Sequence, residues 1–234
     1  MFPGEAHVLK VGLTGGMASG KSVVGEMFVA LGASLTQADQ IAHELMQPGQ
    51  DVYKAVVEHF GMEILNPDGS VNRPKLAEAA FGQGNGKGKS RVEELNRIVH
   101  PAVIQRQEDW MEEMGQQDPR AVAIVEAALI FEAGADKGFD RLVVVTCRDE
   151  QRAERLAARL KLDPATAQRE VRRRMAAQWP DARKVKAADY VIDNSGSLDN
   201  TERQVRELYQ KLKEEATAKE IRKSPVRMRR SSRR

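Results

Sequence analysis

The 234-residue chain is 41% hydrophobic and 30% charged, with a formal net charge of +3, which is typical of a soluble globular protein with one domain or a main domain with insertions. No apolar run approaches the roughly 20 residues that span a bilayer, so we predict no membrane span. The N-terminal MFPGEAHVLK lacks a charged start followed by an apolar block, so we predict no signal peptide either.

The first predicted strand, HVLKVGLT at 7–14, leads into a glycine-rich loop and then a helix. Residues 15–22 read G-x-x-x-x-G-K-S, and the apolar positions of KSVVGEMFVALG have helical spacing as far as Gly32. Such a loop directs successive backbone N–H groups, and the positive end of the helix, at one phosphate. We predict that Lys21 reaches the β- and γ-phosphates of a nucleoside triphosphate and that the Ser22 hydroxyl ligates Mg²⁺. The predicted nucleotide-binding residues are Gly15, Gly16, Met17, Ala18, Ser19, Gly20, Lys21, Ser22 and Val23.

The middle of the chain is predicted to be mostly helical. After a short strand in GASLTQ, Asp39 opens a helix that runs through Leu45. Further helical patterns occupy 51–61, 73–81 and 91–115, the last of them kinked or split by Pro101. The glycine-rich stretch 82–90 follows no strand, so we interpret it as a flexible loop and not as a second phosphate site. We therefore predict a helical insertion from about residue 40 to about residue 115.

The second half alternates strands with helices. In order, we predict strands in 121–131 and 141–147, two helices in 149–178 with the second starting at Pro164, a strand in 188–196 and a helix over 199–216. This alternation after a phosphate loop predicts an α/β protein with the P-loop NTPase fold, a doubly wound parallel sheet. The single cysteine, Cys147, lies in an apolar run and is interpreted as a small core residue and not as a nucleophile. With no disulfide possible, a reducing cytoplasm is expected.

Two groups of residues could complete a site for phosphoryl transfer. Asp39 follows the second strand at the sheet edge where ligands of α/β proteins bind, so its carboxylate could accept a proton from an alcohol; the alternative is a helix cap. Arg155 and Arg159 share a helix face and could close over ATP as part of an arginine-rich lid at about 150–180. The alternative is that the arginines of this region lie on a solvated surface: Arg152, Arg155, Arg159, Arg172, Arg173 and Arg174. Glu126, at the end of its strand, is a candidate for the water shell of Mg²⁺.

The basic character belongs to the C-terminal end. Residues 219–234 contain eight Lys or Arg and one Glu, whereas residues 1–218 carry 29 basic and 33 acidic side chains. The end has little apolar material, so we predict a kinase domain at 1–218 and a disordered basic tail at 219–234. A solvated tail is favoured over a nucleic-acid-binding one.

Several stretches together resemble the dephospho-CoA kinase family, in that family's order, from about residue 9 to about residue 212. They are GLTGGMASGKS, QADQIAHEL, DGSVNRPKLAEAAF, LNRIVHP, ALIFE, RLAAR, AAQ and ADYVIDNSG. The resemblance implies a P-loop core with a helical CoA-binding domain and a helical lid. It implies that ATP, with Mg²⁺, phosphorylates the ribose 3′-hydroxyl of dephospho-CoA. It also implies that Lys21 binds phosphate and Ser22 binds the metal, that Asp39 is the base, and that Arg155 or Arg159 is the lid arginine that reaches ATP.

The sequence departs from the family pattern at three positions. Gln37 stands where the family has the first aspartate of an Asp-Ala-Asp motif, Ala18 replaces a glycine of the loop, and Ala128 stands where proline often occurs. Two other classes remain open from the sequence: another small-molecule kinase, of nucleotide or shikimate type, and a non-catalytic nucleotide- or RNA-binding protein that uses its basic tail. The sequence does not fix the oligomeric state.

Overall fold

The computed structural model describes residues 8–81, 90–176 and 178–223. The chain divides into two compact units, Met1–Leu35 with Trp110–Arg234, and Thr36–Asp109, which we describe one at a time. Across the described ranges, no helix is long and apolar enough to cross a membrane.

The first unit is built on a five-stranded sheet in the order β2-β3-β1-β4-β5. The strands are β1 (Leu9–Gly15), β2 (Ser34–Gln37), β3 (Val122–Glu126), β4 (Arg141–Thr146) and β5 (Tyr190–Asp193). The central strand β1 pairs in parallel with β3 and β4, and β4 pairs in parallel with β5. Ligands of such sheets bind beyond the carboxyl ends of the strands, and the loop after β1 leaves the sheet at that edge.

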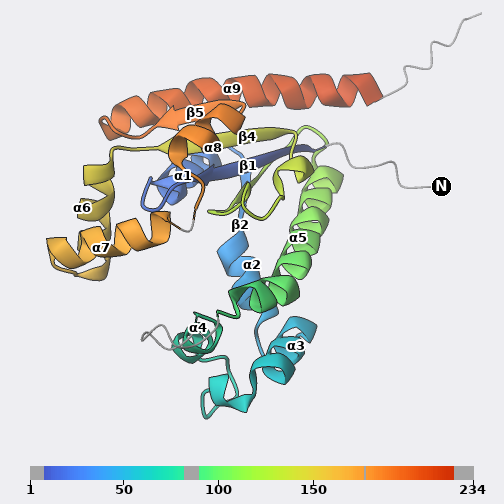
Figure 1. The fold of residues 1–234 in the computed structure, drawn as a ribbon. Helices are drawn as coiled ribbons and strands as arrows, with labels where there is room; N and C mark the ends of the chain where they lie inside the picture. Colours follow the sequence, from blue (N-terminus) through green and yellow to red (C-terminus); the bar gives the residue numbers. More distant parts are fainter. Residues whose placement is uncertain (1–7, 82–89, 177, 224–234) are drawn as a thin grey trace, which may run out of the picture. The chain divides into compact units, whose positions relative to one another are not determined.

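Helices cover both faces of this sheet (Figure 1). One face is covered by α1 (Lys21–Ala30) and α9 (Leu198–Lys223), and the other by the part of α5 (Val92–Gln117) from Trp110 onward. The unit also contains α6 (Asp149–Leu160), α7 (Pro164–Met175), α8 (Asp181–Ala187) and a 3₁₀ turn η2 at Asp136–Gly138. Successive residues of β3 point to opposite faces: Ile124 packs with α1 and α9, whereas Ala123 packs with Met111 of α5. Both faces are therefore buried, which is why the strands read as continuous apolar runs. The predicted α/β fold with a doubly wound sheet is confirmed.

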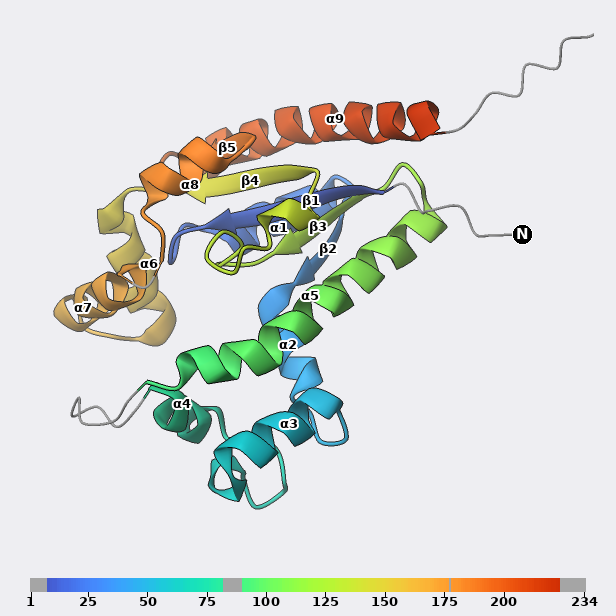
Figure 2. The same ribbon diagram turned by 45° about the vertical axis from the view of Figure 1, so that its right-hand side comes forward.

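Helices α6 and α7 form a hairpin that follows β4 (Figures 1 and 2). Lys161, with a φ of 52°, ends α6 in the left-handed conformation, and the Asp163 side chain accepts a hydrogen bond from the backbone N–H of Thr166 to start α7. Pro164 occupies the first helical position, where its missing N–H costs nothing. The predicted break at Pro164 is confirmed.

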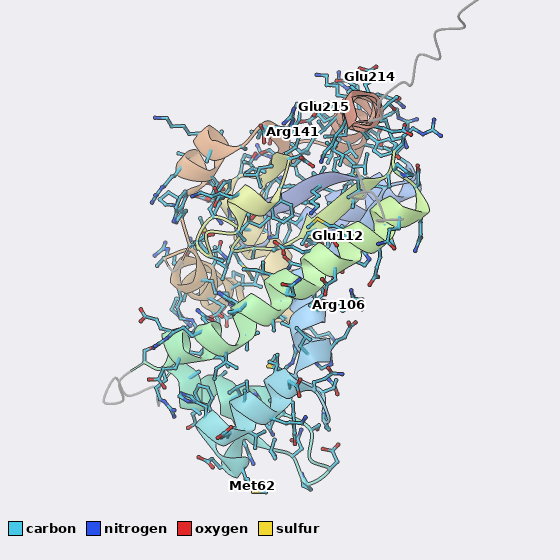
Figure 3. All side chains as sticks on the ribbon, turned by 90° about the vertical axis from the view of Figure 1, so that its right-hand side faces the viewer. Met62, Arg106, Glu112, Arg141, Glu214 and Glu215 are labelled. Carbon is cyan, nitrogen blue, oxygen red and sulfur yellow. The ribbon has the colours of Figure 1, made fainter. Side chains whose placement is uncertain are left out.

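The last helix, α9, is fastened to the sheet by polar contacts as well as by its apolar face. Glu215 binds the Arg141 guanidinium at 2.7 Å and accepts a 2.6 Å hydrogen bond from the Tyr190 hydroxyl, and Figure 3 labels Arg141 and Glu215. The hydrogen bond to Glu215 raises the pKa of Tyr190. Further along α9, Lys219 donates to the Val8 carbonyl at 3.0 Å and to Asp140 at 2.6 Å. Residues 219–223 are thus helical, and the prediction of disorder from residue 219 is wrong for them; 224–234 lie outside the described residues.

The second unit is helical. It contains α2 (Ala38–Leu45), α3 (Asp51–Phe60), a 3₁₀ turn η1 (Met62–Ile64), α4 (Arg73–Phe81) and the first part of α5. These elements share one apolar core, which includes Ile41, Val56, Phe60, Ile64, Leu76 and Val103. The predicted insertion at about 40–115 overlaps this unit. Pro101 lies inside α5 and does not split it, and the loop predicted at 82–90 falls almost entirely outside the described residues.

Candidate active site

The glycine-rich loop wraps the N-terminus of α1. A hydrogen bond from the Ser19 N–H to the Gly16 carbonyl closes a turn, and Gly20, with a φ of 96°, is the N-cap of the helix. Ala18 also takes the left-handed conformation, with a φ of 54°. The first turn of α1 has no acidic side chain, so its positive end is available to an anion.

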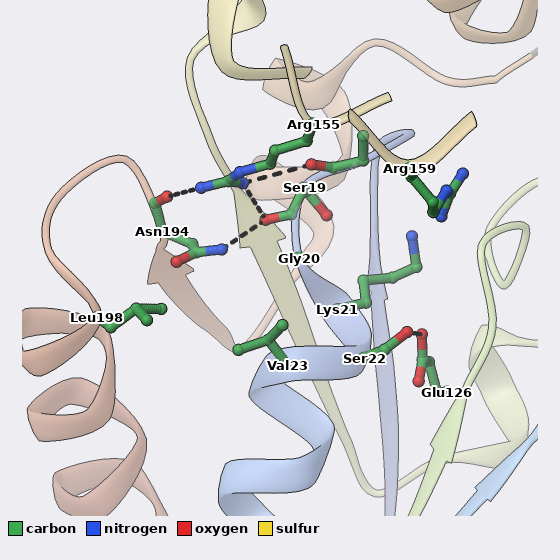
Figure 4. A pocket seen from close by; sticks show the side chains of 11 residues that line it. Ser19, Gly20, Lys21, Ser22, Val23, Glu126, Arg155, Arg159, Asn194 and Leu198 are labelled. Carbon is green, nitrogen blue, oxygen red and sulfur yellow. Dashed lines mark hydrogen bonds between the residues drawn. The ribbon is translucent and has the colours of Figure 1, made fainter. Parts of the chain in front are cut away.

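A pocket of about 500 Å³ opens beside this loop (Figure 4). It is lined by Ala18, Ser19, Gly20, Lys21, Ser22, Val23, Glu126, Arg155, Arg159, Asn194 and Leu198. The lining combines the loop and the start of α1 with the carboxyl ends of β3 and β5 and one face of α6. Six of the nine sequence-predicted nucleotide-binding residues, together with Arg155 and Arg159, therefore lie around one space, and all of it belongs to the first unit.

The two side chains predicted to handle phosphate and metal lie in the first turn of α1. Lys21 donates to the carbonyls of Gly15 and Gly16 at 3.1 and 3.3 Å, which holds its ammonium inside the loop. The Ser22 hydroxyl donates to Glu126 at 2.8 Å, and Glu126 is 8% exposed at the end of β3. Because the Ser22 hydroxyl directs its hydrogen to Glu126 in this hydrogen bond, its oxygen retains lone pairs that can bind a cation.

Donors from outside the loop occupy its outward carbonyls. Arg155 donates to the carbonyls of Ala18 and Ser19 at 3.3 and 3.1 Å, and the Asn194 amide donates to the Ser19 carbonyl at 2.9 Å. The Met17 carbonyl accepts a 2.7 Å bond from Arg152. Since the C=O and the following N–H of a trans peptide point in opposite directions, these contacts turn N–H groups of the loop toward its inner side.

Arg152 is the largest fully buried side chain of the described residues, not a solvated one. It forms ion pairs with Asp149, at 3.2 Å, and with Asp181 at the start of α8. A Cβ on Gly16 would lie 2.5 Å from its guanidinium, so Gly16 is needed for this close approach. The interpretation of Arg152 as a surface residue is wrong, and no sequence pattern named Asp181 as its partner.

Arg155 and Arg159 differ in what they bind. The guanidinium of Arg155 is committed to the two loop carbonyls and, at 2.9 Å, to the backbone carbonyl of Asn194. Arg159, one turn later on α6, lines the pocket and forms no hydrogen bond or ion pair with the rest of the described chain.

Cys147 lies against the loop and not in the middle of the core. Its Sγ is 3.7 Å from the Ala18 carbonyl, and the side chain is half-buried. Burial raises the pKa of its thiol, which opposes a nucleophilic role.

Asp39 lies in the other unit, in the first turn of α2. The N-cap of α2 is Gln37, which makes no side-chain capping hydrogen bond, so the alternative role of Asp39 as the helix cap is wrong. The Asp39 carboxylate is exposed.

A family model described as dephospho-CoA kinase matches residues 9–200. The chain belongs to the dephospho-CoA kinase family. This confirms the resemblance found in the sequence and makes the protein a P-loop kinase.

Curated relatives agree with this assignment. The dephospho-CoA kinase of Syntrophotalea carbinolica is 40% identical over 88% of this chain and 92% of its own length. That of Corynebacterium efficiens is 39% identical over 82% of this chain and 92% of its own. The chain thus spans nearly the whole length of these relatives.

Solved structures show the same fold. TT1252 from Thermus thermophilus superimposes with a TM-score of 0.69 at 27% identity, covering 88% of this chain and 98% of that protein. The dephospho-CoA kinase from Campylobacter jejuni gives a TM-score of 0.62 at 22% identity, covering 88% and 97%. The predicted P-loop fold is confirmed.

Sequence reasoning missed Asn194 as a site residue. It lies at the end of the predicted last strand, within the stretch ADYVIDNSG, which was used only to identify the family. A polar residue directly after a buried strand, at the ligand-binding edge of the sheet, was the signal that pointed to it.

Proposed function

We propose that this chain transfers the γ-phosphoryl group of ATP to the ribose 3′-hydroxyl of dephospho-CoA, giving coenzyme A and ADP. The observation that carries the proposal is the convergence of Lys21, Ser22 and Arg159 on one pocket at the N-terminus of α1. Phosphoryl transfer is catalysed mainly by positioning and by positive charge around the transferring group, and these groups supply both. The choice of acceptor rests on the family and on relatives named dephospho-CoA kinase.

In the proposed reaction, the 3′-oxygen forms a bond to the γ-phosphorus while the bond from that phosphorus to the β–γ bridging oxygen breaks. Backbone N–H groups of the loop 15–20 and the Lys21 ammonium hold the β- and γ-phosphates. We assign Arg159 to the charge that develops on the transferring group, because Arg155 is already bound to carbonyls of the loop.

The residues present fit Mg²⁺. The Ser22 oxygen is oriented by Glu126, and we propose Ser22 as the direct ligand with Glu126 beside it. Mg²⁺ keeps several waters and binds phosphate oxygens of the nucleotide, so it needs few ligands from the protein. When bound, Mg²⁺ neutralises phosphate charge.

Asp39 is our candidate for the general base. It lies two residues after the end of the edge strand β2, and its exposed carboxylate can accept the proton of the 3′-hydroxyl as the new bond forms. Gln37, two residues earlier, cannot take a proton at neutral pH, so Asp39 is the only carboxylate of residues 34–40 available for that role.

We place the reaction in the cytoplasm, where ATP is supplied and a free thiol such as that of Cys147 stays reduced. Dephospho-CoA is the proposed small-molecule partner. Nucleic acid is not proposed as a partner, because residues 1–218 carry more acidic than basic side chains.

The test is ATP consumption by the purified chain against a panel of acceptors: dephospho-CoA, shikimate, gluconate and nucleoside monophosphates. We expect turnover with dephospho-CoA to exceed that with every other acceptor by at least about a hundredfold, because a site built to bind a large ligand loses binding energy with a truncated one. ³¹P NMR of the product should show a new phosphomonoester at the 3′ position. Comparable turnover with another acceptor would reassign the substrate.

A further inference from the structure

Asn194, the residue directly after β5, is 3% exposed and hydrogen-bonded through both ends of its side chain. Its Nδ2 donates to the Ser19 carbonyl at 2.9 Å, and its Oδ1 accepts from the Thr201 hydroxyl at 2.9 Å. A carbonyl oxygen only accepts hydrogen bonds, so the Ser19 contact requires the nitrogen of the amide on that side. The orientation of the Asn194 amide is therefore fixed by the loop.

The Asn194 backbone is fixed as well. Its N–H donates to the Thr146 carbonyl at the end of β4, at 2.9 Å, and its carbonyl accepts from Arg155 at 2.9 Å. The side chain thus projects toward the loop from a support that is anchored to the sheet and to α6. A donor held in this way can define the position of the group that it binds.

The group that it binds is the peptide between Ser19 and Gly20. In a planar trans peptide, the carbonyl and the following N–H point in opposite directions. Because the Ser19 carbonyl is directed to Asn194, the Gly20 N–H is directed away from it. Gly20 is also the N-cap of α1, so its N–H lies where the helix end and the loop present donors to phosphate.

Gly20 shows how closely the loop is built around this amide. A Cβ added to Gly20 would lie 2.1 Å from Nδ2 of Asn194, a separation that no side chain can adopt. The φ of 96° independently favours glycine. The absence of a side chain at residue 20 therefore gives the amide access to the loop backbone.

We propose that Asn194 is a positioning residue for nucleotide binding: it fixes the Ser19–Gly20 peptide so that the Gly20 N–H is presented to a phosphate of ATP. The proposal rests on the proposed function only in requiring ATP at the loop, and it does not depend on which alcohol is phosphorylated. Arg155 donates to the same carbonyl at 3.1 Å, so loss of Asn194 loosens this peptide without releasing it.

The test compares Asn194→Leu and Asn194→Ala with a matched control, Gln204→Leu. Gln204 forms two hydrogen bonds with the backbone of Asp193, the residue just before Asn194, and touches no carbonyl of the loop. Leucine has a volume similar to that of asparagine but forms no hydrogen bonds, and alanine is smaller. If one of the two variants does not fold, ATP binding can still be measured with the other.

We expect both Asn194 variants to bind ATP about tenfold more weakly in calorimetry without acceptor, as for one lost hydrogen bond to a charged group. The KM for ATP should rise in parallel, while the KM for dephospho-CoA should change less than twofold. Gln204→Leu should lower the Tm and leave ATP affinity within twofold of wild type.

Two outcomes would overturn the proposal: ATP affinity within twofold of wild type in a folded Asn194 variant, or an equal loss of affinity in Gln204→Leu. The second would mean that any loosening of the β5 end weakens ATP binding. If the wild-type chain itself fails to bind ATP, the proposed function fails, and that result is distinct from unchanged ATP binding in the variants.

Discussion

The Ser22 hydroxyl donates a 2.8 Å hydrogen bond to the Glu126 carboxylate, which joins the first turn of α1 to the end of β3. The two residues are 104 positions apart in the sequence. The contact fixes the direction of the Ser22 proton, and therefore of the oxygen lone pairs that a cation can use.

Glu126→Gln should weaken the use of Mg²⁺. The substitution removes the charge beside Ser22, and loss of such a supporting group typically costs about 10- to 100-fold in metal affinity or activity. The measurement is a Mg²⁺ titration of activity at saturating ATP, which should show a half-maximal concentration raised at least tenfold. Ser22→Ala should raise the half-maximal Mg²⁺ concentration by a similar factor. The free-energy effect of the double variant should be smaller than the sum of the two single effects, because the residues act together. An unchanged Mg²⁺ dependence would separate Glu126 from the metal site.

Lys21→Ala should reduce turnover strongly with the fold intact. The ammonium is held inside the loop by two backbone carbonyls, and loss of a charge of this kind costs on the order of 10²- to 10³-fold in kcat. Steady-state kinetics and a thermal melt give the answer. Lys213→Ala, which removes a lysine of α9 that contacts the Arg120 carbonyl, should leave kcat unchanged. Near-normal turnover in a folded Lys21→Ala protein would remove Lys21 from the mechanism.

Arg155 and Arg159, the two arginines of α6 that line the pocket, should differ in phenotype when substituted. Arg159→Met should lower kcat with little effect on the Tm, because Arg159 bonds to no other part of the described chain. Arg155→Met should lower both ATP affinity and the Tm, because it removes one donor from each of two loop carbonyls, those of Ala18 and Ser19. Measuring kcat, ATP affinity and Tm for both variants tests the assignment, and reversed phenotypes would exchange the two roles.

Asp39→Asn should collapse kcat while ATP still binds. A general base contributes typically about 10²- to 10⁴-fold, and asparagine cannot accept the proton. Stability should change by less than about 1 kcal/mol, because Asp39 contributes only its charge near the N-terminus of α2. Asp51→Asn is the matched control: it removes an acidic residue from the first turn of α3 in the same unit. If kcat fell less than about tenfold, the base would have to be sought elsewhere.

Two truncations test the boundary of the C-terminal end. Deleting 224–234 should leave kcat and the Tm close to those of the full chain, as predicted for a solvated tail. Deleting 219–234 should also preserve kcat but should lower the Tm, because it removes the ion pair between Lys219 and Asp140. Melts and kinetics of both proteins decide the point. A large loss of kcat in the shorter deletion would place the tail in the site.

Local patterns predicted most of the fold. Gly15 to Ser22 identified the loop, Pro164 the start of α7, and apolar runs the strands, because each depends on residues near one another in the sequence. Asn194 could not be assigned its role in this way, since its partner Ser19 is 175 positions distant. The interpretation of Arg152 as a surface residue was wrong for another reason. Arginine is usually solvated, and only the fold shows that Arg152 is buried against Asp181.

The central place of β1 in the sheet has a consequence for synthesis on the ribosome. In β1, Leu9 pairs with Val122 and Val11 pairs with Arg141. More than half of the chain must therefore be synthesised before β1, the first strand to be made, can pair with either neighbouring strand. The helical unit Thr36–Asp109, by contrast, has a core drawn entirely from its own continuous segment. We therefore expect this unit to fold first as the chain emerges, with the nucleotide pocket assembled only after β5 and α9 leave the exit tunnel.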